Sequence, residues 1–216
     1  MTDVQLPTDV HAVLFDMDGT LVDSLEAWFL AAEQLWGQPI PRDTDPALLG
    51  GTISDVVDLY IEHHPGTDPD DVATLIGRLI EDNLAHGVPA MPGADDLVRR
   101  LAGRVPIAVA SNSPSRLVHS TLAGQRWTGL FGAELGLDDV ERGKPDPDLY
   151  LAAAATFDAD ITRCVVVEDS PTGVDAGRAA GAFVLAVGSV VEGAGDLWVP
   201  SLDDSRVRSW APTRPR

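Results

Sequence analysis

The stretch VLFDMDGTLVDS at residues 13–24 decides how the rest of the chain is interpreted. An apolar run, VHAVLF at residues 10–15, stops abruptly at Asp16, and Gly19 follows shortly after. Short apolar runs bounded by turn residues are typical of strands buried on both faces of a parallel sheet. The stretch therefore predicts a buried strand that carries two carboxylates, those of Asp16 and Asp18, at its C-terminal end.

Further apolar runs alternate with helical patterns along the second half of the chain. Strands that alternate with helices predict right-handed crossovers and a parallel sheet covered on both faces, an α/β fold of the Rossmann-like type. The expected strands are residues 106–110, 164–167 and 182–187, with a possible edge strand at 196–200, and the expected helices are 95–101, 147–157 and 174–180.

Residues 22–89 interrupt this alternation, because they contain helical patterns and no convincing strand. A single crossover needs only about 30 residues, so we interpret the segment as an inserted helical cap rather than as extra helices packed on the sheet. The predicted core domain is then residues 1–21 and 90–216. The cap helices are expected at residues 24–36, 54–64 and 70–85, with Ser54 and Asp70 as N-caps.

A second acidic pair, Glu168-Asp169, follows the apolar run at residues 164–167. Parallel strands end at the same edge of a sheet, so this pair is expected beside Asp16 and Asp18. Clusters of carboxylates suit hard cations such as Mg²⁺, and no His or Cys spacing suggests zinc.

Two loops offer groups that hold phosphate. Ser111 and Asn112 end one predicted strand, and Lys144 is the only lysine of the chain. Taken singly, each motif has an ordinary explanation, because Asp and Gly are common in turns and most lysines are solvated. Together, the four motifs favour a phosphate site built at the strand ends.

In this order and spacing the motifs resemble those of the haloacid dehalogenase superfamily of phosphatases and phosphomutases. The match comprises DMDGT at residues 16–20, Ser111-Asn112, Lys144-Pro145 and Glu168-Asp169, and it spans nearly the whole predicted core. The insertion resembles the small helical cap of that family. The nearest likeness is to the branch that holds β-phosphoglucomutase and phosphoglycolate-type phosphatases.

The resemblance implies a role for each matching residue. Asp16 would attack phosphorus and form an aspartyl-phosphate, while Asp18 would protonate the leaving oxygen and later deprotonate a water. Lys144 would be the catalytic cation. The implied phosphate-binding residues are Gly19, Thr20, Ser111, Asn112 and Lys144.

The resemblance also implies a metal and a place for substrate selection. Mg²⁺ would be held by Asp16, by the backbone carbonyl of Asp18, and by Asp169 with Glu168. Selectivity would lie in the cap, in residues such as Trp28, Thr52 and Ser54.

A sugar-phosphate mutase is the first alternative to a phosphatase. In the β-phosphoglucomutase pattern a His stands twelve residues after the nucleophile, where this chain has Trp28. By alignment of the loop at residues 49–55, Ser54 replaces a cap arginine, and Thr20 stands where the mutase has Val. Without a cap cation to grip a second phosphate, hydrolysis of a small organic monophosphate is favoured.

Two other classes fit less well. A dehalogenase shares the attacking carboxylate but has no need of Asp18. A receiver-like signalling domain uses similar groups, but its acidic pair comes first, its acceptor comes later, and it has no cap.

Composition limits the partners. The 216 residues are 44% hydrophobic and carry a net charge of −19, a field that disfavours nucleic acids and anionic membrane surfaces. No signal peptide or spanning helix is visible, and the single Cys164 asks for no oxidising compartment, so a cytoplasmic protein is expected. The expected partner is a small phosphorylated metabolite, and a monomer or weak dimer is the default because nothing in the sequence indicates the oligomeric state.

Overall fold

The computed structural model describes residues 4–41 and 52–215. Six strands form one sheet in the order β3-β2-β1-β4-β5-β6, and every neighbouring pair is parallel. Phe15 is level with Val109 and Val167 on the two flanking strands, so the central strands end together. The strands are β1 (Ala12–Phe15), β2 (Ile107–Ala110), β3 (Ala133–Leu135), β4 (Cys164–Glu168), β5 (Phe183–Val187) and β6 (Leu197–Val199).

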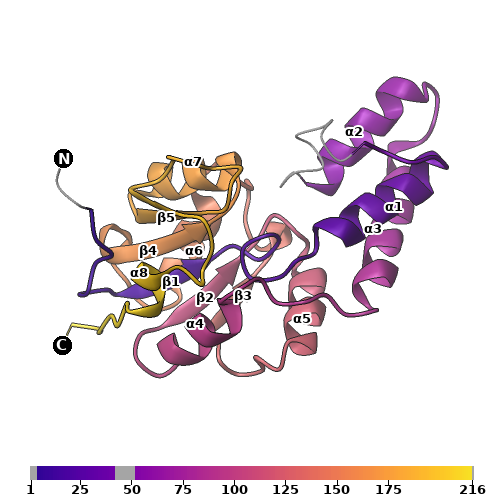
Figure 1. Cartoon of the computed structure of the whole chain (residues 1–216). Coiled ribbons are helices and arrows are strands. Elements are labelled where there is room, and N and C mark those ends of the chain that lie inside the picture. The colour runs from indigo at the N-terminus through magenta and orange to yellow at the C-terminus, as the bar shows by residue number, and fades with distance from the viewer. Residues whose placement is uncertain (1–3, 42–51, 216) are drawn as a thin grey trace.

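Helices cover both faces of the sheet (Figure 1). On β1, Val13 and Phe15 pack in one apolar cluster with α4 and α5, whereas Ala12 and Leu14 pack in another with α6 and α7. The helices of the first face are α4 (Ala94–Leu101), α5 (Ser115–Gly124) and α8 (Ser205–Arg208); those of the second are α6 (Asp148–Ala155) and α7 (Pro171–Ala180). Two short 3₁₀ helices, Leu137–Asp139 and Ile161–Arg163, lie in the connections.

Three helices stand apart from the sheet and share an apolar cluster of their own (Figure 1). They are α1 (Leu25–Trp36), α2 (Ile53–His63) and α3 (Pro69–Leu84). One residue of the sheet region, Leu117 on α5, also belongs to this cluster. The helical unit therefore rests on α5 and has its own small core.

The N-caps predicted for two of these helices are wrong. Thr52 caps α2, because its hydroxyl accepts from the Asp55 N–H while the Asp55 carboxylate accepts from the Thr52 N–H. Asp68 caps α3 by accepting from Asp70 N–H, and Pro69 follows at the first helical position. Ser54 and Asp70 therefore lie inside the first turns.

The two chain segments that join the helical unit to the sheet lie against each other. Val22 and Ala90 form an antiparallel bridge, Asp23 N–H donates to the Pro89 carbonyl at 2.9 Å, and Met91 N–H donates to the Leu21 carbonyl at 2.9 Å. The connection is thus a paired, two-stranded hinge. The division of the chain into domains at residues 22 and 89 stays a prediction.

The parallel α/β sheet is confirmed, with its predicted strands, including the edge strand near residues 196–200. Strand β3 was not predicted, since it has three residues, all only partly buried, and gives no apolar run.

Candidate active site

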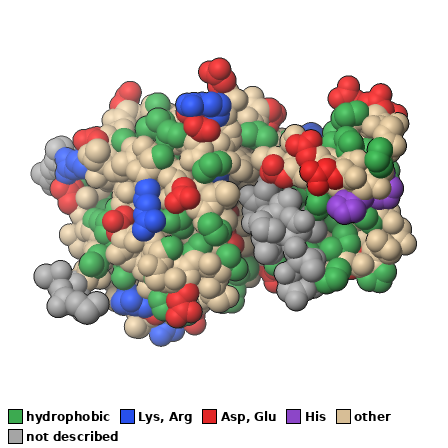
Figure 2. Space-filling model, turned by 90° about the horizontal axis from the view of Figure 1, so that it is seen from above, with side chains coloured by type: hydrophobic (Ala, Val, Ile, Leu, Met, Phe, Trp, Pro, Cys, Tyr) green, Lys and Arg blue, Asp and Glu red, His purple; other side chains and the backbone are tan. Residues whose placement is uncertain are grey.

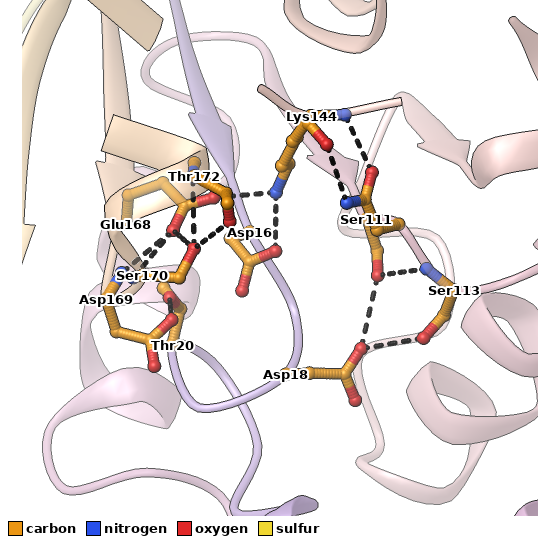
Figure 3. A network of polar contacts seen from close by, with 12 residues as sticks. Asp16, Asp18, Thr20, Ser111, Ser113, Lys144, Glu168, Asp169, Ser170 and Thr172 are labelled. Carbon is orange, nitrogen blue, oxygen red and sulfur yellow. Dashed lines mark hydrogen bonds and ion pairs between the residues drawn. The ribbon is translucent and has the colours of Figure 1, made fainter. Parts of the chain in front are cut away.

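Asp16 lies at the C-terminal end of β1, where its side chain meets the only lysine of the chain. Its backbone N–H continues the sheet by donating to the Val167 carbonyl at 3.0 Å. Lys144 Nζ lies 2.6 Å from Asp16 Oδ1 and 2.7 Å from Glu168 Oε1 (Figure 3). All three side chains are almost completely buried. A single ammonium therefore bridges two carboxylates that come from neighbouring strands.

The backbone of Lys144 is held by the side chain of Asn112. Asn112 Oδ1 accepts from Lys144 N–H at 2.8 Å, and Asn112 Nδ2 donates to the Lys144 carbonyl at 3.2 Å. Gly143 is required beside this amide, because a Cβ there would lie 2.7 Å from Asn112 Oδ1. The structure thus uses the Asn112 side chain to position the lysine, and its role in binding phosphate stays a prediction.

Glu168 is the most heavily bonded carboxylate of the site. Its Oε1 accepts from Lys144 and, at 2.8 Å, from the Tyr150 hydroxyl. Its Oε2 accepts from Asp169 N–H and from both the N–H and the hydroxyl of Ser170. With five donors and no solvent exposure, Glu168 is a fixed anchor rather than a free ligand.

The start of α7 leaves space for this anchor. A Cβ on Gly173 would lie 1.7 Å from Glu168 Oε1, so a side chain at this position would displace the carboxylate. Ser170 is the N-cap of α7, and its hydroxyl accepts from Gly173 N–H while donating to Glu168. The helix N-terminus and the carboxylate are therefore built as one unit.

Three carboxylates form a group that could hold a metal ion. One oxygen each from Asp16, Glu168 and Asp169 can be chosen so that all lie within 4.8 Å of one another. Asp169 accepts from the Thr20 hydroxyl at 2.8 Å, which fixes it against the loop that follows β1. Gly19 has a φ of 82°, and a Cβ there would lie 2.2 Å from Asp169 Oδ2, so only glycine fits this turn.

The electrostatics of the group call for added positive charge. Burial raises the pKa of Asp16 well above its usual range, and of its neighbours Lys144 opposes this while Glu168 and Asp169 add to it. Burial, with Glu168 adding, raises the pKa of Asp169 to about 7. Burial lowers the pKa of Lys144, but Asp16 and Glu168 more than offset this and hold it above its usual value. The donor set and its excess negative charge fit a hard divalent cation.

Asp18 points away from this group toward the hydroxyls of Ser111 and Ser113 (Figure 3), and a third hydroxyl, that of Ser24, also donates to it. Ser24 donates to its Oδ1 at 2.6 Å, whereas Ser111 and Ser113 donate to its Oδ2 at 3.1 and 2.9 Å. Ser24 lies at the hinge before α1, and the other two serines lie in the loop after β2. The structure therefore brings Ser111 to Asp18, and separates the Asp18 side chain from the three possible metal ligands.

The predicted cap residues are placed as follows. Trp28 on α1 is 8% exposed and packs in the apolar cluster of the helical unit, so packing accounts for it. Thr52 caps α2, and Ser54 is exposed in the first turn of that helix. Residues 49–51 of the expected substrate loop lie outside the described residues. A role in substrate selection stays a prediction for all three.

Four site residues were missed: Ser24, Ser113, Tyr150 and Ser170. Three carried a usable signal, because Ser24 closes the opening motif, Ser113 directly follows Asn112 in the loop expected to hold phosphate, and Ser170 precedes a Pro that starts a helix. Tyr150 gave none, since its helical spacing predicts only core packing.

The surface agrees with the acidic composition. On the face shown in Figure 2, the charged side chains of the helical unit are mostly acidic, with histidines beside them. In the described part of the chain, no helix combines the length and apolarity needed to cross a bilayer.

Comparison with known proteins identifies the family. The model for haloacid dehalogenase-like hydrolases matches residues 10–181, which include every residue of the site described above. The chain belongs to this family of hydrolases, and the resemblance found in its four motifs is confirmed.

Individual proteins of known name and known structure are also similar to this chain. The chain is 36% identical over 183 residues to hexitol phosphatase A of Escherichia coli, covering 81% of each chain. It is 38% identical to the bifunctional riboflavin kinase/FMN phosphatase of Arabidopsis thaliana over 130 residues, which are 57% of this chain and 34% of that protein. The crystal structure of CbbY from Rhodobacter sphaeroides in complex with phosphate has the same fold, with a TM-score of 0.79 at 24% identity over 90% of this chain and 96% of that one.

Proposed function

We propose that the protein is a Mg²⁺-dependent phosphatase that hydrolyses small organic phosphomonoesters through an aspartyl-phosphate on Asp16. The observation that carries the proposal is the buried ammonium of Lys144 between Asp16 and Glu168, beside a third carboxylate, Asp169. One carboxylate is thereby kept beside a cation at the strand ends, where a phosphoryl group can approach it.

In the first step an oxygen of Asp16 attacks phosphorus. The bond between phosphorus and the ester oxygen breaks as the new bond forms, and Asp18 gives its proton to the leaving alkoxide. Lys144 would hold the phosphoryl oxygens, together with the Ser111 hydroxyl once Asp18 has turned away from it. The N–H groups of Gly19 and Ser111 already donate to backbone carbonyls, and the Thr20 hydroxyl donates to Asp169, so these three groups would shape the loop around the phosphoryl group.

In the second step water hydrolyses the intermediate. The water oxygen attacks phosphorus, its proton passes to Asp18, and the bond to Asp16 breaks, which restores both carboxylic groups and releases phosphate. Asp18 must leave its three serine hydroxyls to reach the reacting oxygens, so we propose that it turns during each cycle.

Asp16 and Asp169, with the backbone carbonyl of Asp18, would hold the Mg²⁺ directly. Both oxygens of Glu168 already accept hydrogen bonds, so this residue would support the metal site rather than fill it. Bound Mg²⁺ would supply positive charge that stabilises the phosphoryl oxygens and the crowded carboxylates.

The substrate body is proposed to be small and without a second anionic group. Lys144 is engaged by two carboxylates, and the described cap has Arg78 as its only Lys or Arg. The hexitol phosphatase relative supports a sugar phosphate or a similar polyol phosphate as the substrate.

The test is phosphate release from p-nitrophenyl phosphate and a panel of sugar phosphates, with and without Mg²⁺. Asp16→Asn should abolish release and the acid-stable phosphoryl adduct seen by mass spectrometry after quenching. Asp158→Asn is the matched control, because this exposed residue follows α6, at the opposite end of the sheet, and has a φ of 50° that Asn accepts. Faster isomerisation of a hexose 1-phosphate than phosphate release would support the mutase, and activity in Asp16→Asn would refute the proposal.

A further inference from the structure

Tyr150 is a buried polar side chain that the proposed reaction does not use. It lies on α6, six residues after Lys144, and has no solvent exposure. Its hydroxyl donates to Glu168 Oε1 at 2.8 Å, and the same oxygen lies 2.7 Å from Lys144 Nζ. The tyrosine and the lysine therefore share one acceptor atom.

The ring of Tyr150 also contacts the lysine directly. Lys144 Nζ lies 4.9 Å from the ring centroid, within the range of a cation–π interaction. Leu149 and Ala153 on the same helix are completely buried in the core cluster, so the packing around the helix fixes the position of the ring. Tyr150 thus touches the ammonium from one side and its carboxylate partner from another.

The shared acceptor matters because an ammonium has three N–H donors. Two of them are directed to Asp16 and Glu168, which leaves one for a phosphoryl oxygen under the proposed function. In a dry site a poorly satisfied carboxylate attracts a neighbouring cation strongly. The Tyr150 hydroxyl uses part of the hydrogen-bonding capacity of Glu168 Oε1 and so weakens the attraction between this oxygen and the Lys144 ammonium.

Packing alone does not require the hydroxyl. A phenylalanine would fill the same space, whereas a buried hydroxyl is unfavourable unless it is hydrogen-bonded. Burial holds the pKa of Tyr150 well above its usual range, so the phenol stays a donor at neutral pH.

We propose that Tyr150 is a positioning residue: it fixes Glu168 Oε1 and thereby keeps the ammonium of Lys144 directed at Asp16 and at the phosphoryl group. The inference rests on the proposed function, in which Lys144 serves a phosphoryl group. It adds a residue that acts through another and does not itself touch the substrate.

The test compares Tyr150→Phe with Tyr60→Phe, because these are the only two tyrosines of the chain. Tyr60 lies on α2, where it stacks on His64 and meets Trp36 edge to face, away from the charged group. Four measurements are made: the affinity for inorganic phosphate in saturating Mg²⁺ by calorimetry, kcat and KM for p-nitrophenyl phosphate, the Mg²⁺ concentration for half-maximal activity, and the thermal midpoint.

We expect Tyr150→Phe to lower kcat about tenfold and to weaken phosphate binding several-fold, with the Mg²⁺ concentration for half-maximal activity changed less than twofold. Tyr60→Phe should leave all of these unchanged. A Tyr150→Phe protein with wild-type kcat and wild-type phosphate affinity overturns the inference, whatever its thermal midpoint.

The measurements separate this inference from the proposed function. If wild type releases phosphate from no substrate, the proposed function fails, while the calorimetric comparison still decides the role of Tyr150. If Tyr150→Phe is less stable, the phosphate and Mg²⁺ titrations are run well below the thermal midpoint of this variant, so that only folded protein is compared.

Discussion

Asp16 and Asp18 are separated by one residue, yet their side chains lie in opposite surroundings. Asp16 is buried and paired with the buried ammonium of Lys144, next to the carboxylates of Glu168 and Asp169. Asp18 is partly exposed and is held only by three neutral hydroxyls. Between them Met17 is completely buried in the core and anchors the turn.

The difference shows which half of the site is preset. Charges in a buried group are costly to rearrange, because each would lose its partner in a low-dielectric interior. Hydroxyl contacts to a partly exposed carboxylate are easier to exchange for water. The nucleophile side is therefore the more rigid half of the site, and the acid side, which holds Asp18, is the half that turns under the proposed function.

The strongest way to break the rigid half is Gly173→Ala. The new Cβ would lie 1.7 Å from Glu168 Oε1, so Glu168 must leave its five donors and Lys144 must lose a partner. We expect a loss of about 3 kcal/mol or more in the free energy of unfolding, a fall of roughly 6–12 °C in thermal midpoint, together with loss of activity.

Gly124→Ala is the matched control for thermal denaturation. Gly124 is exposed at the end of α5, and a Cβ there has no neighbour within 4 Å, so this change should be neutral or slightly stabilising. Equal midpoints for the two variants would mean that Glu168 has room that the structure does not show.

Asp18→Asn tests the acid side of the site through the leaving group. Without a proton donor, kcat should fall about 10²–10⁴-fold on a sugar phosphate, whose alkoxide leaves poorly. On p-nitrophenyl phosphate the first step needs little proton transfer, so phosphorylation of Asp16, followed as the nitrophenol burst, should change much less. If the rate of the nitrophenol burst fell as much as kcat on the sugar phosphate, that result would argue against an acid role for Asp18.

The rigid half should also bind metal in a pH-dependent way. Burial raises the pKa of Asp169 to about 7, so below this pH a proton competes with Mg²⁺, and the apparent affinity should weaken by up to about tenfold per pH unit. Because the folded pKa lies above the unfolded value, this residue stabilises the metal-free fold at low pH, and that contribution is lost as the pH rises through about 7.

Calorimetric Mg²⁺ titrations between pH 5 and 8, with thermal midpoints of the metal-free protein over the same range, check both signs. Asp169→Asn should bind Mg²⁺ weakly at every pH and lose the part of the slope in stability that Asp169 contributes, whereas the part from Asp16, whose pKa burial also raises, should remain. An affinity for Mg²⁺ in wild type that does not vary with pH would exclude Asp169 as the titrating ligand.

The surroundings of the two aspartates could be predicted from the sequence only in part. The apolar run before Asp16 and the run before Glu168 predict adjacent buried strands, because only strands covered on both faces are apolar throughout. Their acidic ends therefore could be placed together. The hydrogen-bond partner of each polar group could not be predicted. Asn112 was expected to bind phosphate but holds the Lys144 backbone, and Tyr150 reaches Glu168 only through the packing of α6.

The smallest expected effect comes from Ser24→Ala, which removes one of the three hydroxyls that hold Asp18 away from the other carboxylates. A hydrogen bond of this kind contributes about 1 kcal/mol, so turning of Asp18 toward the reacting oxygens should become up to about fivefold more favourable. We expect kcat on a sugar phosphate to rise by a few-fold and the nitrophenol burst to stay the same. Ser120→Ala is the control, because its hydroxyl bonds only within α5, to the Leu117 carbonyl. A fall in kcat as large as that of Asp18→Asn would instead show that Ser24 orients Asp18 for proton transfer, and the three hydroxyls would then belong to the rigid half of the site.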